Sequence, residues 1–277
     1  MEKDRFESKS EFKGLLKKTI SYHYPHNGGT KNFRTLPRKK QRMILKAKEN
    51  DMEKTEELET AQERIGLFGG TFSPIHFGHL RASEEVQEFF HLDKIIFIPA
   101  RIPPHKTEKG IVAPEHRLNM VKLAIQDNPC FEISDFEIQR NSKSYSIITI
   151  EHFQKKLGFD TSLFFLMGMD AFLEINTWKD FAQLFFLTNF IIMSRPGYPK
   201  KASADLLPLD GNKNFAYNSD GNYYIHSSGH KLFFQAITLL DFSSRAIRSR
   251  LKGKRSIRYL VPPVIEHYIK KHGLYQD

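Results

Sequence analysis

From Arg64 to the C-terminus, short apolar runs alternate with amphipathic segments, and this alternation constrains the fold more than any other feature of the chain. It is typical of parallel strands joined by helices that cover both faces of one sheet. The predicted strands are 64–68, 94–99, 131–134, 163–167, 190–194 and 231–236. The predicted helices are 79–91, 114–125, 146–157, 243–251 and 262–272. We therefore predict an α/β fold with a doubly wound parallel sheet and C-terminal helices.

One stretch between two late strands lacks this alternation. Residues 197–230 are rich in Gly, Asn, Ser, Asp and Lys. This composition is typical of connections that run over the surface, so we predict one long surface loop.

A glycine-rich turn follows the first predicted strand and leads into a helix. Residues 69–79 read Gly-Gly-Thr-Phe-Ser-Pro-Ile-His-Phe-Gly-His. Glycines let the backbone approach phosphate oxygens, and the unpaired amides and positive dipole of a helix start attract anions. His76 and His79 are three residues apart, so they project from the same side of the helix start. The candidate phosphate-binding residues of the turn itself are Gly69, Gly70, Thr71 and Phe72.

The net charge of +10 is unevenly distributed, with a local +10 in residues 1–48, −5 in residues 49–64 and +5 in the rest of the chain. Residues 1–48 contain 14 lysines and arginines against 4 acidic residues, whereas residues 49–64 contain 7 acidic against 2 basic residues. Segment 1–63 has few aliphatic residues, so we predict a basic and largely disordered extension, with a charged helix over 41–62. A single domain, 64–277, follows.

The role of this extension is left open between three hypotheses. It is a solvated tail without a role in chemistry, an arm that binds RNA or a partner, or in part a product of start-codon choice, since Met43 and Met52 precede the first strand. The first is the simplest, and the moderate charge of the remaining chain does not favour nucleic-acid binding outside the tail.

The remaining composition excludes several classes of protein. The single cysteine, Cys130, excludes a disulfide framework and a cysteine-based metal cluster, and it fits a reducing cytosol. The most apolar stretch, 184–193, is interrupted by Thr188 and Asn189 and is too short to span a bilayer. The N-terminus has no apolar signal-peptide core. We expect a cytoplasmic protein without a membrane segment.

Segment 70–79 resembles the HxGH signature of the nucleotidyltransferase superfamily, and the wider set of motifs resembles bacterial nicotinate-nucleotide adenylyltransferase. The resemblance extends over residues 64–275 and implies the Rossmann-like nucleotidyltransferase fold. Segment 241–248, Asp-Phe-Ser-Ser-Arg-Ala-Ile-Arg, resembles the second phosphate clamp of the family, often written ISSTxIR. A helix that starts at Ser243 or Ser244 would expose its amides there, and Arg248 would lie one turn further along. The resemblance implies His76, His79 and Arg248 as catalytic residues.

Three departures from the family pattern affect these phosphate sites. Phe242 replaces the isoleucine of the second clamp, and Arg245 replaces its threonine. The added cation is compatible with a triphosphate, although it changes the expected contacts. Ser73 stands where the family usually has aspartate or asparagine, and its hydroxyl can still hydrogen-bond within the turn.

Further segments resemble the substrate-binding parts of the same family. His105 and Lys106, in the Pro-Pro-His-Lys loop after the second strand, offer cationic donors for substrate and phosphate respectively. Segment 140–146 resembles the cradle of the nicotinate carboxylate, and a strand-end aspartate followed by the only tryptophan resembles the pyridine site. The implied substrate-binding residues of these two segments are Ser144, Tyr145, Ser146, Asp170 and Trp178.

The resemblance implies transfer of the adenylyl group of ATP to nicotinate mononucleotide, which gives nicotinate adenine dinucleotide and pyrophosphate. No general base is required because the attacking phosphate oxygen is already ionised, and Mg²⁺ is expected mainly on the ATP phosphates rather than on protein ligands. The alternatives are adenylyl transfer to nicotinamide mononucleotide or pantetheine phosphate, and a non-catalytic nucleotide- or RNA-binding protein. The Pro-Pro-His-Lys loop, segment 144–146 and Trp178 argue against the pantetheine substrate. A homo-oligomer is compatible with the sequence.

Overall fold

The chain divides by its internal contacts into two units, 1–61 and 62–277. The computed structural model describes residues 21–22, 31–32, 62–104, 110–158, 160–194, 206–208 and 214–276. In the first unit the described residues form two short antiparallel strands, β1 (Ser21–Tyr22) and β2 (Lys31–Asn32). The predicted disorder of the extension and its predicted charged helix otherwise fall outside the described residues, so both stay predictions.

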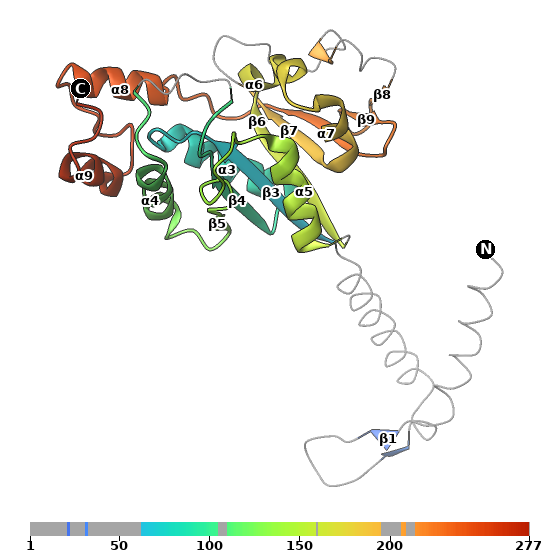
Figure 1. Cartoon of the computed structure of the whole chain (residues 1–277). Coiled ribbons are helices and arrows are strands. Elements are labelled where there is room, and N and C mark those ends of the chain that lie inside the picture. The colour runs from blue at the N-terminus through green and yellow to red at the C-terminus, as the bar shows by residue number, and fades with distance from the viewer. Residues whose placement is uncertain are drawn as a thin grey trace. The chain divides into compact units, whose positions relative to one another are not determined.

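The second unit is built on one eight-stranded sheet, whose strands other than β10 are labelled in Figure 1. The strands are β3 (Glu63–Gly70), β4 (Lys94–Pro99), β5 (Phe131–Ile133), β6 (Thr161–Gly168), β7 (Asn189–Met193), β8 (Phe215–Asn218), β9 (Tyr223–His226) and β10 (Lys231–Gln235). They lie in the order β5-β4-β3-β6-β7-β10-β9-β8. The first six run parallel, and β9 and β8 are added antiparallel. The chain order reverses between β3 and β6, and such a switch point is where α/β sheets bind ligands.

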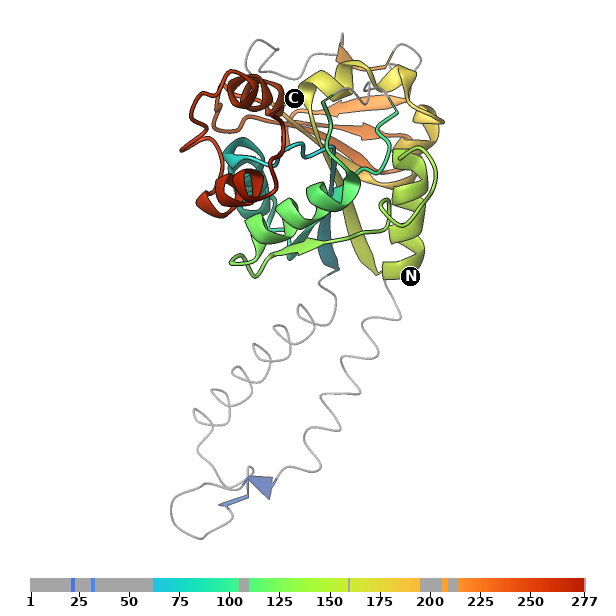
Figure 2. The same cartoon turned by 60° about the vertical axis from the view of Figure 1, so that its left-hand side comes forward.

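Helices cover both faces of this sheet, as Figures 1 and 2 show from two sides. The helices are α3 (Phe77–Phe90), α4 (Pro114–Ile125), α5 (Ser146–Leu157), α6 (Met169–Leu173), the 3-10 turn η2 (Ile175–Thr177), α7 (Phe181–Leu187), α8 (Ser244–Lys252) and α9 (Pro263–Lys271). One buried apolar cluster joins the sheet to α3, α4, α8 and α9, and a second joins it to α5, α6 and α7. The predicted doubly wound α/β fold is therefore confirmed.

The middle of the central strand β3, residues 65–68, is apolar and buried because the sheet is covered on both faces there. Ile65 and Leu67 belong to the cluster on the α5 side, whereas Phe68 belongs to the cluster on the α3 side. A parallel strand that is covered on both faces needs apolar residues at consecutive positions. Gly69 and Gly70 form the carboxyl end of the strand, beyond these packed residues.

The prediction of one long loop over residues 197–230 is wrong for its last part. β8 and β9 form an antiparallel hairpin there and extend the sheet beyond β10. Tyr224 and His226 are buried, and the His226 ring lies 6.0 Å from that of Phe185 in α7. The polar residues of the hairpin turn dominate the composition of this stretch and mask the alternation of buried and less buried residues in β9. The short helices α6 and α7 were also not predicted from the sequence.

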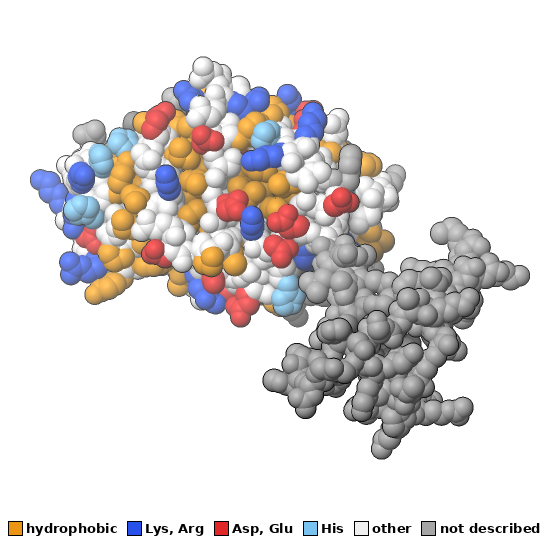
Figure 3. Space-filling view, turned by 90° about the horizontal axis from the view of Figure 1, so that it is seen from below, with side chains coloured by type: hydrophobic (Ala, Val, Ile, Leu, Met, Phe, Trp, Pro, Cys, Tyr) orange, Lys and Arg blue, Asp and Glu red, His pale blue; other side chains and the backbone are white. Residues whose placement is uncertain are grey.

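The surface of the second unit carries both signs of charge. In the view of Figure 3, basic and acidic side chains are interspersed over the described surface. No helix among the described residues is long and apolar enough to cross a membrane.

Candidate active site

A cavity of about 950 Å³ opens at the carboxyl ends of β3 and β6, where the order of the sheet reverses. The predicted site residues that line it are Gly69, Gly70, Thr71, Phe72, His76, His79, Ser144, Tyr145, Ser146, Asp170, Trp178, Ser243, Ser244 and Arg248. His105 and Lys106 lie outside the described residues. The structure thus brings together segments that are up to 179 residues apart in the sequence, while the roles of these residues stay predictions.

The glycine turn has a conformation that requires the absence of a side chain. A Cβ on Gly70 would lie 2.7 Å from the ring of Phe72, which is closer than such contacts allow. Phe72 itself adopts a left-handed backbone conformation, with φ of 46°, and its ring is buried. The ring packs edge-on against that of His79, at a centroid distance of 5.1 Å. Phe72 therefore contributes packing that orients His79, in addition to forming the turn.

The two histidines stand together at the start of α3. His76 is the N-cap of the helix and its ring stacks on that of His79, with the centroids 3.7 Å apart. The backbone N–H of His76 donates to Nδ1 of His79 over 3.3 Å. Because Nδ1 accepts this bond, the neutral His79 ring carries its proton on Nε2 and can donate it. A Cβ on Gly78 would lie 3.0 Å from the His76 ring, so glycine keeps this side of the helix thin.

Part of the helix start is already engaged within the protein. The N–H of Phe77 donates to the carbonyl of Leu260 over 3.1 Å, and the N–H of His79 donates to the carbonyl of His76 over 2.9 Å. The first turn of α3 therefore has fewer amides for an anion than its sequence suggests. Its anion-binding capacity rests more on the two imidazoles.

The start of α8 faces the same turn from the other side. Ser243 caps the helix, and its Oγ accepts the N–H of Ala246 over 3.2 Å. Within the described part of the chain, no partner is found for the N–H groups of Ser244 and Arg245, as is usual at a helix start. These amides and the positive end of the helix dipole suit an anion.

Arg248 and Ser244 tie α8 directly to the turn. The Ser244 hydroxyl donates to the carbonyl of Pro74 over 2.9 Å, and Nη1 of Arg248 donates to the carbonyl of Ser73 over 2.7 Å. Burial lowers the pKa of Arg248, and nearby Arg245 lowers it further, but a guanidinium stays protonated in proteins. Arg248 is therefore a fixed positive charge between the two segments that are predicted to bind phosphate.

The opposite end of the cavity is formed by the start of α5 and the residues after β6. The N–H groups of Ser146 and Ile147 have no hydrogen-bond partner among the described residues. The hydroxyl of Ser144 accepts the backbone N–H of Arg101 over 2.9 Å, which joins this segment to the loop after β4. Trp178 lines the cavity and packs edge-on against Phe165. Asp170 is predicted at the strand end but is the second residue of α6, two residues beyond the end of β6 at Gly168.

Two charged residues of this end were not predicted from the sequence. The Lys179 ammonium lies 5.2 Å from the centre of the Tyr145 ring, beside the start of α5. Glu137 is buried and accepts the Thr149 hydroxyl over 2.6 Å. Burial raises the pKa of Glu137, although its hydrogen bonds with Thr149 and Ser144 oppose this shift. A lysine directly after the only tryptophan was the one signal in the sequence for this part of the site.

Arg117 was also missed, because it lies in a helix and far from any motif. It is 1% exposed and donates to the carbonyls of Val112, Thr71 and Arg101 over 3.1, 2.9 and 2.9 Å, and also to that of Ala100. Its guanidinium thereby connects the glycine turn to the loop after β4. Among the described residues, no three His, Cys, Asp or Glu side chains are grouped so as to hold a metal ion.

The chain is similar to known proteins of one family. The family model described as "Cytidylyltransferase-like" matches residues 67–250. A protein of Syntrophotalea carbinolica named "Probable nicotinate-nucleotide adenylyltransferase" is 45% identical over 214 residues, which are 77% of this chain and 98% of that protein. A protein of the same name from Citrifermentans bemidjiense is 44% identical over 214 residues, 77% of this chain and 99% of its own.

A solved structure shares the fold. Nicotinic acid mononucleotide adenylyltransferase of Plasmodium falciparum, complexed with NaAD, superposes with a TM-score of 0.59 at 20% identity. The match covers 77% of this chain and 97% of the other. At this identity the likeness supports the fold, while the bacterial relatives and the family model establish the kinship. The chain therefore belongs to the nicotinate-nucleotide adenylyltransferase family, within the cytidylyltransferase-like proteins.

Proposed function

We propose that the protein transfers the adenylyl group of ATP to nicotinate mononucleotide, which yields nicotinate adenine dinucleotide and pyrophosphate. The observation that carries this proposal is the single cavity that joins the two phosphate-binding segments to the start of α5 and Trp178. Relatives that are 44–45% identical over nearly their whole length carry the name of this activity. The structural neighbours are described as complexes with NaAD and with APC.

The chemistry follows from the charges at the two ends of the cavity. A phosphate oxygen of nicotinate mononucleotide attacks the α-phosphorus of ATP, and the bond to the pyrophosphate oxygen breaks. The attacking oxygen is already ionised at neutral pH, so alignment and charge stabilisation remain as the work of the protein. His76, His79 and Arg248 donate to the charge that develops on the phosphoryl oxygens and the departing pyrophosphate.

The mononucleotide binds at the other end of the cavity. The unpaired N–H groups at the start of α5 donate to the nicotinate carboxylate, and the Lys179 ammonium adds positive charge near Tyr145. Trp178 offers an aromatic surface to the pyridine ring. A neutral nicotinamide would use these donors less well, which favours the nicotinate form.

We also propose that Mg²⁺ accompanies the reaction on the phosphates of ATP. The donors around the phosphate site are imidazoles, a guanidinium and amides, and these bind anions rather than a hard cation. The ion would neutralise charge on the triphosphate, while the protein residues hold the phosphates. A cytoplasmic location is proposed on the basis of the single cysteine.

Pyrophosphate release tests the proposed function. The purified chain is incubated with ATP and Mg²⁺ and, in separate reactions, nicotinate mononucleotide, nicotinamide mononucleotide or 4′-phosphopantetheine. We expect the highest kcat/KM with nicotinate mononucleotide, and nicotinate adenine dinucleotide as the product found by mass spectrometry. Higher efficiency with either other acceptor would assign the chain to that substrate. No release with any acceptor would favour the binding-protein alternative.

A further inference from the structure

The connection between β10 and α8 forms one wall of the cavity. We call residues 236–242 the connecting strap. Ile237, Thr238 and the residues that follow them line the cavity, and the strap continues directly into the Ser243 cap of α8. The position of the strap therefore affects where the amides of α8 are presented to a phosphate.

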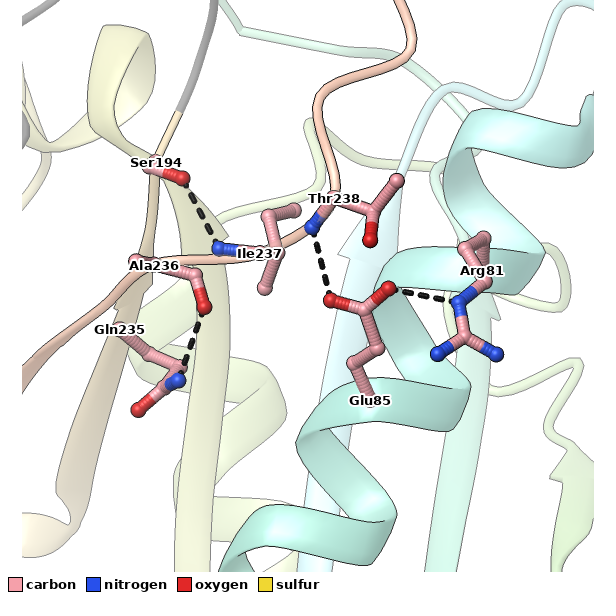
Figure 4. Close-up of polar contacts among 7 residues, drawn as sticks. All are labelled: Arg81, Glu85, Ser194, Gln235, Ala236, Ile237 and Thr238. Carbon is pink, nitrogen blue, oxygen red and sulfur yellow. Dashed lines mark hydrogen bonds and ion pairs between the residues drawn. The ribbon is translucent and has the colours of Figure 1, made fainter.

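Two backbone N–H groups hold the first part of the strap, and Figure 4 shows both contacts. The N–H of Ile237 donates to Oγ of Ser194 over 3.1 Å. The N–H of Thr238 donates to Oε2 of Glu85 over 2.7 Å. Nε of Arg81 donates to the other oxygen, Oε1, over 2.6 Å and fixes the carboxylate from within α3. A hydrogen bond from an amide to a carboxylate is among the stronger kinds.

Beyond Thr238 the backbone of the strap makes few hydrogen bonds. The N–H of Phe242 donates to the carbonyl of Leu240 over 2.8 Å. Within the described residues, the N–H groups of Leu239 and Leu240 have no partner. Among the described residues, the Glu85 carboxylate is therefore the last hydrogen-bond partner that another helix gives the strap before α8 begins. After it, the Phe242 ring packs edge-on against that of His76, at a centroid distance of 5.5 Å.

Glu85 and the two histidines belong to the same helix. His79 and Glu85 are six residues apart in α3, which is about 9 Å along the helix axis. The same helix, α3, thus carries the histidines of the proposed phosphate site and the carboxylate that binds the strap. The strap in turn leads to the start of α8, the other half of that site. The two halves are far apart in sequence, so their spacing depends on contacts of this kind, together with the direct bonds from Ser244 and Arg248 to the turn.

We propose that Glu85 is a positioning residue that fixes the strap, and through it the start of α8, relative to the histidines of α3. This inference rests on the proposed function and extends it to the binding of a nucleoside triphosphate. Without the Glu85 contact, the strap would be in place in only a fraction of the molecules. The apparent affinity for the triphosphate would then be the intrinsic affinity multiplied by that fraction. A bound triphosphate would restore the arrangement, so the rate at saturation would change little.

The test compares steady-state kinetics of Glu85→Ala, Glu85→Gln and the control Glu88→Ala, which removes an exposed carboxylate of the same helix. For Glu85→Ala we expect the KM for ATP to rise about tenfold, as for loss of one charge-assisted hydrogen bond. We expect kcat within about threefold of the wild type and an unchanged KM for the mononucleotide. Glu85→Gln should restore most of the affinity, because its amide oxygen can still accept the Thr238 N–H.

Binding of ATP alone, measured by calorimetry, separates this inference from the proposed function. Weaker ATP binding by Glu85→Ala supports the inference even if no acceptor gives turnover. An unchanged ATP affinity, a loss confined to kcat, or an equal rise in both KM values would overturn it. If Glu85→Ala does not fold, Arg81→Met serves instead, since it removes the Arg81 hydrogen bond that fixes the Glu85 carboxylate. An ATP affinity equal to that of the wild type in Arg81→Met would also overturn it, as would absence of ATP binding by the wild type.

Discussion

Contacts with His76 and Phe72 orient the ring of His79. Its Nδ1 accepts the His76 N–H, and its ring packs against Phe72. Replacing His79 by alanine removes the Nε2 donor without exposing a large buried surface. We expect kcat to fall by about 10²–10³, as on loss of one donor to a developing charge. Turnover at saturating concentrations of both substrates measures this effect.

Folding controls accompany the His79→Ala measurement. Its melting temperature and far-UV spectrum should stay close to those of the wild type. A variant that is folded and turns over at nearly the normal rate would contradict a catalytic role for His79.

We expect the charge of Lys179 to contribute to the distinction between the two pyridine mononucleotides. Its ammonium lies over the Tyr145 ring, close to the proposed carboxylate site. The side chain is exposed, and exposed ion pairs contribute about 1 kcal/mol or less, so the effect should be modest. We expect Lys179→Met to lower the ratio of kcat/KM for nicotinate over nicotinamide mononucleotide by up to about fivefold. An unchanged ratio would show that the amides of α5 alone discriminate.

Tyr275 connects the C-terminal end of the chain to the glycine turn. It is buried and its hydroxyl lies 3.1 Å from Oγ of Ser73. Burial raises the pKa of Tyr275 to about 12, although Ser73, Arg248 and Arg117 oppose this shift. An unfolded tyrosine ionises near pH 10, so the folded protein keeps a proton that the unfolded chain loses between about pH 10 and 12.

The stability that this difference provides is complete below about pH 10 and is lost as the pH rises through 12. A shift of about two pKa units corresponds to about 2–3 kcal/mol of unfolding free energy. Tyr275→Phe should remove this part of the pH dependence in urea unfolding between pH 8 and 12. Lysines titrate in both proteins and cancel in the comparison. Parallel pH curves for the two proteins would contradict the assignment.

At the scale of elements, α4 holds the loops of the active site through one buried side chain. Arg117 donates to carbonyls in the glycine turn, at the end of β4 and in the segment before α4. Arg117→Lys keeps the charge but cannot reach all of these acceptors. We expect the free energy of unfolding to fall by about 2–4 kcal/mol, because several buried carbonyls lose their donor. We also expect the KM of both substrates to rise.

Urea unfolding and steady-state kinetics check this expectation. The control is Lys122→Met, at an exposed position of the same helix. A stability of Arg117→Lys equal to that of the wild type would mean that water or another side chain replaces the lost bonds.

The elements that the sequence predicted are those with local signals. Pro114 and Pro263 stand at the first helical positions of α4 and α9, and Gly273 follows α9 with φ of 58°, as a residue after a helix end often does. α7 was missed because it is only seven residues long, and only Thr188 and Asn189 separate its apolar residues from those of β7. The hairpin β8–β9 was missed because its turn is polar and its partner strand, β10, follows it in the sequence.

The same distinction applies to the candidate site. The glycine turn, the histidines and the serines of α8 form contiguous motifs, so their place in the cavity could be predicted. Glu85 and Arg117 could not, because each is a single charged residue in a helix. The partner of Glu85 is 153 residues away, and those of Arg117 are up to 46 residues away. Only the sheet topology brings these groups together.

At the scale of the whole molecule, the most basic segment of the chain and the site belong to different units. The excess of lysines and arginines lies in residues 1–48, whereas the family match covers residues 67–250. Every residue that lines the cavity comes from the second unit, in the part of the chain that the structure describes. The positive charge that the proposed chemistry needs is supplied locally by Arg248, Lys179 and helix starts.

Removal of the N-terminal segment tests this separation. A variant that begins at Met52 loses the basic residues and keeps all of β3, together with ten residues before Gln62. We expect its kcat and both KM values to stay within about twofold of the full chain, because no catalytic charge is lost and screening at physiological salt limits long-range effects. The kinetics are measured at 20 and 150 mM salt. A steering role of the tail would appear as a higher KM at low salt only, whereas lost turnover at both concentrations would show that the tail takes part in the chemistry.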